Sequence, residues 1–489
     1  MSSRCFLSVL LLFLLPTLGV LSSPPNIVVI LADDLGWADV GWNNPGIHTP
    51  TLDRMAREGV ILNQSYVQST CSPSRAAFMS GRYPYHMGMQ HRVIMAGWKQ
   101  YLPDDQPILP EVLHKMGYAT HAIGKWHLGY CAWRYTPTYR GFQSFYGFYE
   151  ALEDYYNHTG HQDAYDFRDN DQVDRTAIGH YSTHLFANRA TRIINEHDVT
   201  QPLFLYLSFQ AVHGPLQVPQ WYVDTYCSHV PASDSKRRLK CGMIAAMDEA
   251  VANVTDVLHQ RGLLNNTFLL FFSDNGGPVN MGGSNWPLRG SKTTLWEGGT
   301  RSPSFVSAPG LLHRTGYTYQ EMIHVSDWFP TLVEAAADGN DTARDIPTNI
   351  DGVSQWRNLL AGSSPGPRTE FVYNFDDLFN NSAIRQGPYK LVHHHPGNPD
   401  GWFAPSEMKD ATTVNLTSPT GHPEYMLFNL LQDPLEKTDV KDVEQEVFQR
   451  LKARMAQYRQ SMVPAVFPGY TEASTPSKYF NNVWSPGWC

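Results

Sequence analysis

The stretch Ser69-Thr-Cys-Ser-Pro-Ser-Arg75 gives the clearest indication of fold and chemistry in this chain. Proline in the first helical turn has a fixed φ and no backbone N–H to leave unpaired, so Pro73 before an apolar run predicts that a helix begins here. Cys71 would then lie at the positive end of the helix dipole, with the Arg75 guanidinium about one turn away. Such groups favour a sulfate or phosphate. A buried structural cysteine before an ordinary helix is the alternative.

The chain also contains three continuous apolar runs. Such runs are typical of strands that are buried on both faces of a parallel sheet. They cover residues 26–32, 203–209 and 267–273. In open α/β sheets, binding sites lie at the carboxyl ends of the strands. The residues that follow the three runs are therefore candidates for a site: Asp33 and Asp34, His213, and Asp274 with Asn275.

Carboxylate and amide oxygens dominate this set. Asp33, Asp34, Asp274 and Asn275 would form an all-oxygen shell, which calcium or magnesium prefers and zinc does not. Acids after a strand also occur commonly as turn or cap residues, which is the structural alternative.

Residues 117–129 hold a second polar pair, Lys125 and His127. Two residues apart, they would face the same side if a strand continued through them. The alternative is a strand end with a solvated lysine. A lone histidine such as His213 after a strand is also commonly a structural residue.

The length of 489 residues predicts two domains, because single cores usually stop growing below this size. A Gly/Ser/Pro-rich stretch at 361–367 predicts a linker between residues 23–360 and 368–489. Helices are expected at 107–116, 182–197, 243–258 and 323–336. The net charge of -9 and the lack of a basic block argue against a nucleic-acid partner.

Residues 1–22 have the features of a cleaved secretory signal, with a basic Arg4 and an apolar segment from Phe6 to Leu15. A membrane anchor is the alternative, but the run falls short of the ~20 apolar residues that a span needs, and no other stretch is long enough. We therefore expect a protein of the secretory pathway without a membrane span.

The cysteines and sequons agree with that route. Cys5 leaves with the signal, and apart from Cys71 four cysteines remain, which allow three pairings. Cys227–Cys241, which closes a short loop, is the favoured pair and leaves Cys131–Cys489. Sequons predict a glycoprotein and lie at Asn63, Asn157, Asn253, Asn265, Asn340, Asn380 and Asn415.

The pattern Cys71-x-Pro73-x-Arg75 resembles the signature of the type I sulfatases, and residues 117–129 resemble the second signature of that family. The resemblance implies an alkaline-phosphatase-like α/β fold. Its large mixed, mostly parallel sheet is flanked by helices, and a smaller C-terminal domain holds an antiparallel sheet. The resemblance also implies that a formylglycine-generating enzyme converts Cys71 to formylglycine (3-oxoalanine), whose hydrate is the nucleophile.

The family's residue roles carry over by position. One Ca²⁺ would be held by Asp33, Asp34, residue 71, Asp274 and Asn275, while Lys125, Lys292 and Arg75 hold the sulfate oxygens. His213 would protonate the leaving alcohol, and His127 would contact the nucleophile's hydroxyl. An unmodified thiol would not serve, because it has no second oxygen with which to eliminate sulfate.

Several further phrases, among them residues 285–290 and 323–328, resemble the branch that includes arylsulfatase B, the N-acetylgalactosamine-4-sulfatase. This implies hydrolysis of sulfate monoesters on glycosaminoglycan sugars and on aryl sulfates, in a lysosomal or secreted enzyme. Gly214 departs from the family's usual glutamate beside the histidine. The alternatives are a phosphatase or phosphodiesterase of the same superfamily and an inactive secreted carbohydrate-binding protein.

Overall fold

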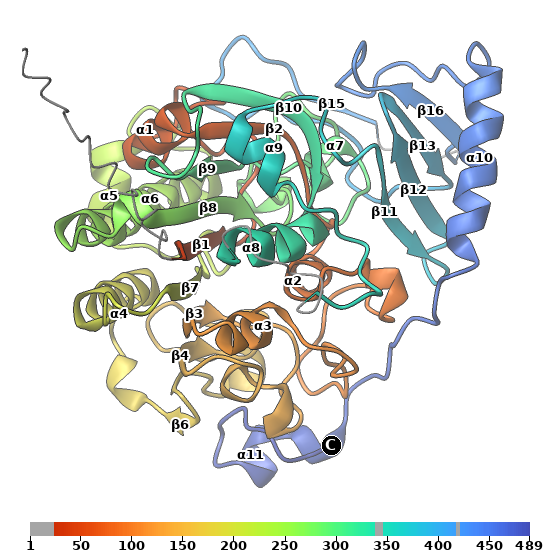
Figure 1. Ribbon diagram of the computed structural model, residues 1–489. Coiled ribbons are helices and arrows are strands. Elements are labelled where there is room, and N and C mark those ends of the chain that lie inside the picture. Colours follow the sequence, from red (N-terminus) through yellow and green to blue (C-terminus); the bar gives the residue numbers. More distant parts are fainter. Residues whose placement is uncertain (1–23, 338–345, 417–420) are drawn as a thin grey trace, which may run out of the picture.

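The computed structural model describes residues 24–337, 346–416 and 421–489, which fold around one large sheet (Figure 1). Within these residues the sheet has ten strands and is mixed but mostly parallel, which confirms the predicted fold class. From one edge to the other the strands are β10 (Tyr317–His324), β2 (Val60–Tyr66), β9 (Phe305–Ser307), β8 (Thr267–Ser273), β1 (Asn26–Ala32), β7 (Leu203–Ser208), β3 (Ala119–Lys125), β4 (Ser144–Phe148), β5 (Arg168–Asp169) and β6 (Gln172–Val173).

The three apolar runs form the neighbouring strands β8, β1 and β7 at the centre of the sheet, parallel to one another. Their side chains are buried on both faces, as the lack of polar alternation predicts. In the register, Leu31 of β1 lies beside Ser208, and Ala32 lies beside Ser273. The polar residues after these strands therefore emerge together at one edge.

Helices cover both faces of the sheet. Ile27, Val29 and Leu31 of β1 join a core cluster with α2 (Cys71–Ser80), α3 (Leu109–Lys115) and α8 (Trp328–Ala336). Val28 and Ile30 join a second cluster on the opposite face. The helices of that face are α1 (Pro50–Glu58), α4 (Ser182–Glu196), α5 (Gln220–Tyr226) and α6 (Ser235–Gln260).

A second, antiparallel sheet lies beside the large one (Figure 1). Helix α10 (Gln445–Arg459) packs on one face through Phe448, Leu451 and Met455. The strands are β11 (Glu370–Asp376), β12 (Asn381–Gln386), β13 (Tyr389–His393) and β16 (Tyr425–Asn429), with a separate pair β14 (Gly401–Trp402) and β15 (Val414–Asn415). The remaining short helices are α7 (Glu297–Thr300), α9 (Trp356–Ala361) and α11 (Pro476–Tyr479).

Two of the expected helices differ from their expected bounds by more than two residues. Residues 323–324 end strand β10, and helix α8 starts at Trp328, because Asp327 accepts the backbone N–H of His324 and sets a 3-10 turn before it. The helix expected at 243–258 is longer and begins at Ser235, where the side chain of Asp234 caps it by accepting the N–H of Arg237.

Both expected disulfides are confirmed: Cys227–Cys241 and Cys131–Cys489. The second ties the C-terminus to the part of the chain around the large sheet, where Trp484 is buried in the core cluster of α2 and α3. The expected signal at 1–22 and the sequon residue Asn340 lie outside the described residues. Across the described parts of the chain, none of the helices has the length and apolar character that a membrane crossing requires.

Candidate active site

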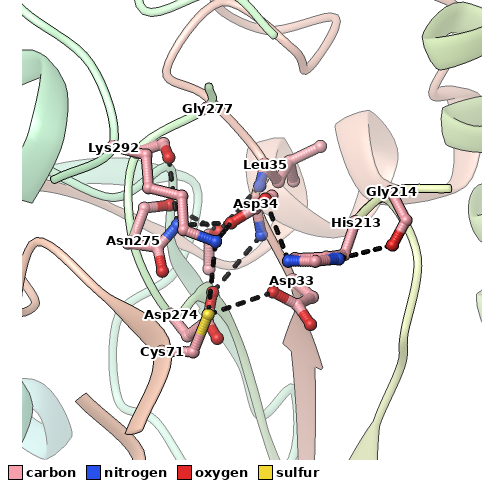
Figure 2. A network of polar contacts seen from close by, with 12 residues as sticks. Asp33, Asp34, Leu35, Cys71, His213, Gly214, Asp274, Asn275, Gly277 and Lys292 are labelled. Atoms are coloured by element: carbon pink, nitrogen blue, oxygen red, sulfur yellow. Dashed lines mark hydrogen bonds and ion pairs between the residues drawn. The ribbon is translucent and has the colours of Figure 1, made fainter. Parts of the chain in front are cut away.

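The acids that follow β1 and β8 meet at the edge of the sheet (Figure 2). The Asn275 side-chain amide donates to Asp34 Oδ1 over 2.7 Å, and the backbone N–H of Asp34 donates to Asp274 Oδ1 over 3.3 Å. These contacts join residues about half the chain apart in sequence. Asp33, Asp274 and Asn275 have no exposed surface, so water screens their charges little.

Cys71 begins helix α2, and its sulfur lies in the same cluster (Figure 2). The sulfur lies 3.4 Å from Lys292 Nζ and 3.7 Å from Asp33 Oδ1. It also lines a cavity of about 480 Å³. Burial, together with the Asp274 carboxylate, raises the pKa of the Cys71 thiol to about 12, although Lys125 and Lys292 act in the opposite direction. The unmodified side chain is therefore a protonated thiol at neutral pH, which is a weak nucleophile.

A lysine pairs with each of the first two aspartates. Lys125, the last residue of β3, places its Nζ 2.5 Å from Asp33 Oδ2. Lys292 places its Nζ 2.5 Å from Asp34 Oδ1. Burial alone would lower the pKa of Lys292, but Asp34 and the other anions raise it well above its usual value. Burial alone would also raise the pKa of Asp34, and Lys292 with its neighbours lowers it.

Arg75 lies beneath the cluster and is fully buried. Its Nε and Nη2 donate to Asp274 Oδ2 over 3.0 and 2.8 Å, and its Nη1 donates to Ser208 Oγ and to the Lys125 carbonyl. In this structure the guanidinium therefore contacts the carboxylate after β8 and does not line the cavity at Cys71.

The two histidines take different positions. His213 Nε2 lies 3.6 Å from Asp34 Oδ2, and its Nδ1 donates to the Gly214 carbonyl over 2.6 Å (Figure 2). Burial lowers the pKa of His213 to about 3. His127 does not continue the strand of Lys125, because β3 ends at Lys125 and His127 has a left-handed φ of 53°. Its Nε2 donates to the Ile94 carbonyl over 2.9 Å, and its buried Nδ1 has no partner.

The donor atoms fit a hard cation. Single ligand atoms of Asp33, Asp34, Cys71 and His213 all lie within 4.8 Å of one another, and no second group of this kind occurs among the described residues. Asn275 Oδ1 is buried without a hydrogen-bond partner. A buried amide oxygen without a donor is costly, and a cation would satisfy it. Asp274, which we expected in the shell, is not part of that group. The carboxylate oxygens of Asp33 and Asp34 and the amide oxygen of Asn275 are ligands that calcium or magnesium prefers.

Lys240 was not expected in this region. It is fully buried in α6, and its Nζ donates to the carbonyls of Asp34 and Val212 over 3.0 and 2.7 Å. A signal for it exists in the sequence, since Lys240 precedes Met243 and Ile244 by three and four residues. A lysine in the apolar stripe of a helix indicates a buried partner.

Two arginines close to Lys292 in the sequence, Arg289 and Arg301, have structural partners. Arg289 pairs with Asp400, which directly precedes β14, with Nε 2.7 Å from Oδ1, and Arg301 donates to the carbonyl of Asn63 over 2.7 Å. The histidine run 393–395 also belongs to no group with metal-binding geometry in the described chain.

Comparisons with known proteins agree with this geometry. Residues 25–338 match the family model described as sulfatase. Arylsulfatase J of Mus musculus is 38% identical over 493 residues, covering 95% of this chain and 80% of that protein. N-acetylgalactosamine-6-sulfatase of Homo sapiens is 29% identical and covers 90% of this chain and 87% of its own.

Among solved structures, the crystal structure of Ps i-CgsB superimposes with a TM-score of 0.77 at 26% identity, covering 92% of this chain and 96% of that one. The family match spans more than half of the residues and contains every candidate site residue. The chain therefore belongs to the sulfatase family and is a sulfatase enzyme.

Proposed function

We propose that this sulfatase hydrolyses sulfate monoesters with formylglycine derived from Cys71. The observation that carries the proposal is the position of the Cys71 sulfur, 3.4 Å from Lys292 Nζ and beside Asp33 in a buried cluster that opens into a cavity. A thiol whose pKa is raised to about 12 is poorly suited to attack sulfur itself. Oxidised to the aldehyde and hydrated, the residue would supply an attacking oxygen.

The oxygen donors around this residue fit one calcium ion. Asp33, Asp34, Asp274, Asn275 and residue 71 would hold it, and Asn275 Oδ1 would gain the partner it lacks. When bound, the ion would neutralise charge on the sulfate and favour ionisation of the nucleophile.

The lysines and Arg75 have separate roles in this proposal. Lys292 and Lys125 bind the non-bridging sulfate oxygens and stabilise the charge that develops on them. Arg75 fixes the orientation of Asp274 through two hydrogen bonds to one carboxylate oxygen, so it acts as a positioning residue.

The histidines move protons. His213 donates Nδ1–H to the Gly214 carbonyl, so a proton for the leaving alcohol must be carried on Nε2 in the imidazolium form. Burial opposes that form, and a sulfate anion beside the ring favours it. His127, which lines the cavity of Cys71, has an unpartnered Nδ1 that can accept a proton.

The proposed substrates are sulfated glycosaminoglycan sugars of the N-acetylgalactosamine 4-sulfate type, together with aryl sulfates. The sequence phrases shared with the arylsulfatase B branch support the sugar, and a relative named N-acetylgalactosamine-6-sulfatase supports the class. The sequons, the two disulfides and the expected signal support a glycoprotein of the lysosome or the cell exterior, matured by a formylglycine-generating enzyme.

The proposal is tested with protein secreted from cells that contain that enzyme. We expect turnover of an aryl sulfate and of N-acetylgalactosamine 4-sulfate, with the 4-sulfate preferred over the 6-sulfate. An aryl phosphate serves as the contrast for the phosphatase alternative. Turnover of the phosphate and not of the sulfates would contradict the proposed reaction, and preference for the 6-sulfate would contradict the proposed sugar.

A further inference from the structure

The reactive centre lies between two cavities. The smaller, of about 480 Å³, contains Cys71, and the larger, of about 1120 Å³, reaches Asp34 on the other side. Four residues line both cavities and join them into one cleft: Leu152, His213, Lys292 and Thr293. The sulfate position therefore lies partway along a cleft that continues in two directions.

The volumes exceed what a small ester needs. Sites for drug-sized ligands typically measure ~300–1,000 Å³, so an aryl sulfate or one sugar sulfate can be held by the smaller cavity alone. The larger cavity would then have no occupant. A chain of several sugar units fills both.

An exposed cation without a carboxylate partner among the described residues lines the smaller cavity. Arg92 lines it, is exposed, and holds its guanidinium 5.2 Å from the ring centre of Phe379, which comes from the smaller domain. No carboxylate within the described residues pairs with Arg92. Its backbone has a left-handed φ of 57°, a conformation that costs energy for a residue other than glycine.

The larger cavity also holds a cation without a carboxylate partner. Lys236, in the first turn of α6, is exposed and donates only to the Asn280 carbonyl, over 2.9 Å, among the described residues. Its neighbour Arg237 is buried against Asp39 and Glu407 and is not free to bind a ligand.

The other charged groups of the larger cavity include three acids. Asp154 and Asp234 accept backbone N–H groups, and Asp163 is exposed. Such carboxylates can accept sugar hydroxyls but repel a second sulfate. This side of the cleft therefore suits a sugar whose anionic group is confined to the position of Lys236.

Resting on the proposed function, we propose that the substrate is an internal sulfated unit of an anionic polysaccharide. The chain lies across both cavities, and an anionic group of the sugar on one side pairs with Arg92 while that on the other side pairs with Lys236. A sulfated galactosamine between two uronates has this distribution of charge.

The first test compares two substrates across variants of the secreted, full-length enzyme. We expect Arg92→Ala and Lys236→Ala each to lower kcat/KM for chondroitin 4-sulfate about threefold relative to kcat/KM for 4-nitrophenyl sulfate, and the double variant about tenfold. Arg314→Ala and Lys99→Ala are the matched controls, since Arg314 is also exposed over an aromatic ring, that of Tyr317, and Lys99 is exposed. An unchanged ratio in the double variant would overturn the proposal.

The second test concerns the position of the sulfated unit. Oligosaccharides with a 4-sulfated galactosamine flanked by uronate on both sides are compared with those in which it is the non-reducing terminal unit. We expect the internal unit to be desulfated at least as efficiently as the terminal one, with a rate that falls as salt rises. Desulfation of the terminal unit alone, or of the aryl sulfate alone, would overturn the inference and leave the proposed reaction standing. Failure with every sulfate, the aryl sulfate included, would overturn the proposed function itself.

Discussion

The reactive centre and the cleft around it are built in opposite ways. Asp33, Lys125 and Arg75 are buried, and each pairs with another residue of the centre within about one hydrogen-bond length. Arg92 and Lys236 are exposed on loop or helix-start positions and have no acidic partner among the described residues. In our proposal the chemistry therefore depends on buried residues at strand ends, whereas the choice of substrate depends on exposed segments.

Among the changes that test this difference between the buried centre and the exposed cleft, substitution of Cys71 should have the largest effect on activity. Cys71→Ala removes the proposed precursor of the nucleophile, so kcat/KM for an aryl sulfate should fall by at least about 10⁴-fold. The thermal unfolding midpoint should change little, because the side chain is small. Appreciable turnover in a correctly folded variant would refute the assignment.

Removal of the proposed calcium ion should have the next largest effect. Chelation should lower turnover of the aryl sulfate by about 10³-fold, since a bound cation contributes several kcal/mol of charge stabilisation. Added Ca²⁺ should restore it, and Asn275→Ala should raise the concentration of Ca²⁺ needed. Metal content is measured alongside activity. Full activity of the metal-free protein, or recovery with zinc alone, is the contrary result.

The effect of substituting Lys292 can be compared directly with the effects of substituting Arg92 and Lys236 in the cleft. Lys292→Ala should lower kcat/KM for the aryl sulfate and for the polysaccharide alike, by about 10²-fold, because it removes a cation that we propose contacts the reacting group. This uniform loss differs from the polysaccharide-selective loss expected for Arg92 and Lys236. Lys99→Ala is the control, and a loss confined to one substrate would count against the role of Lys292.

The smallest expected effect is on stability. It concerns Glu153, which lies in the sequence between the cavity-lining residues Leu152 and Asp154. Burial raises the pKa of Glu153 to about 7, although its partner His158 lowers it. The folded protein therefore keeps a proton that the unfolded chain, with a usual carboxyl pKa of about 4.3, has lost. Because the unfolded state binds fewer protons, stability should be highest at acid pH and fall as pH rises through about 7.

Thermal unfolding measured from pH 5 to 8 tests this. Glu153→Gln should flatten the dependence of the unfolding midpoint on pH, and the exposed Glu196→Gln should leave it unchanged. A slope that is the same in Glu153→Gln as in the wild type would show that the carboxyl does not hold its proton in the folded state.

Much of the reactive centre was predictable because its residues follow buried strands or a helix start directly. The apolar run before Asp33 and the one before Asp274 indicate neighbouring strands, and parallel pairing brings their ends together. The turn at His127 was not predictable, because the left-handed backbone conformation of this residue does not change the pattern of apolar and polar residues. The partner of Arg75 was equally hidden, because side-chain direction within a helix start depends on tertiary packing.

The cleft was not predicted at all. Phe379 and Arg92 lie far apart in sequence, and no periodic pattern links a loop of the smaller domain to a loop of the larger one. Short motifs encode the groups that must be held rigidly. The surface that we propose selects a substrate forms only when the segments around the two sheets pack together.

The most direct test of the account is the intact mass of the peptide that contains residue 71, taken from the active, secreted protein. We expect a peptide in which the cysteine has lost its sulfur and two hydrogens and gained one oxygen, in proportion to specific activity. An active preparation whose residue 71 is entirely an unmodified cysteine would contradict it.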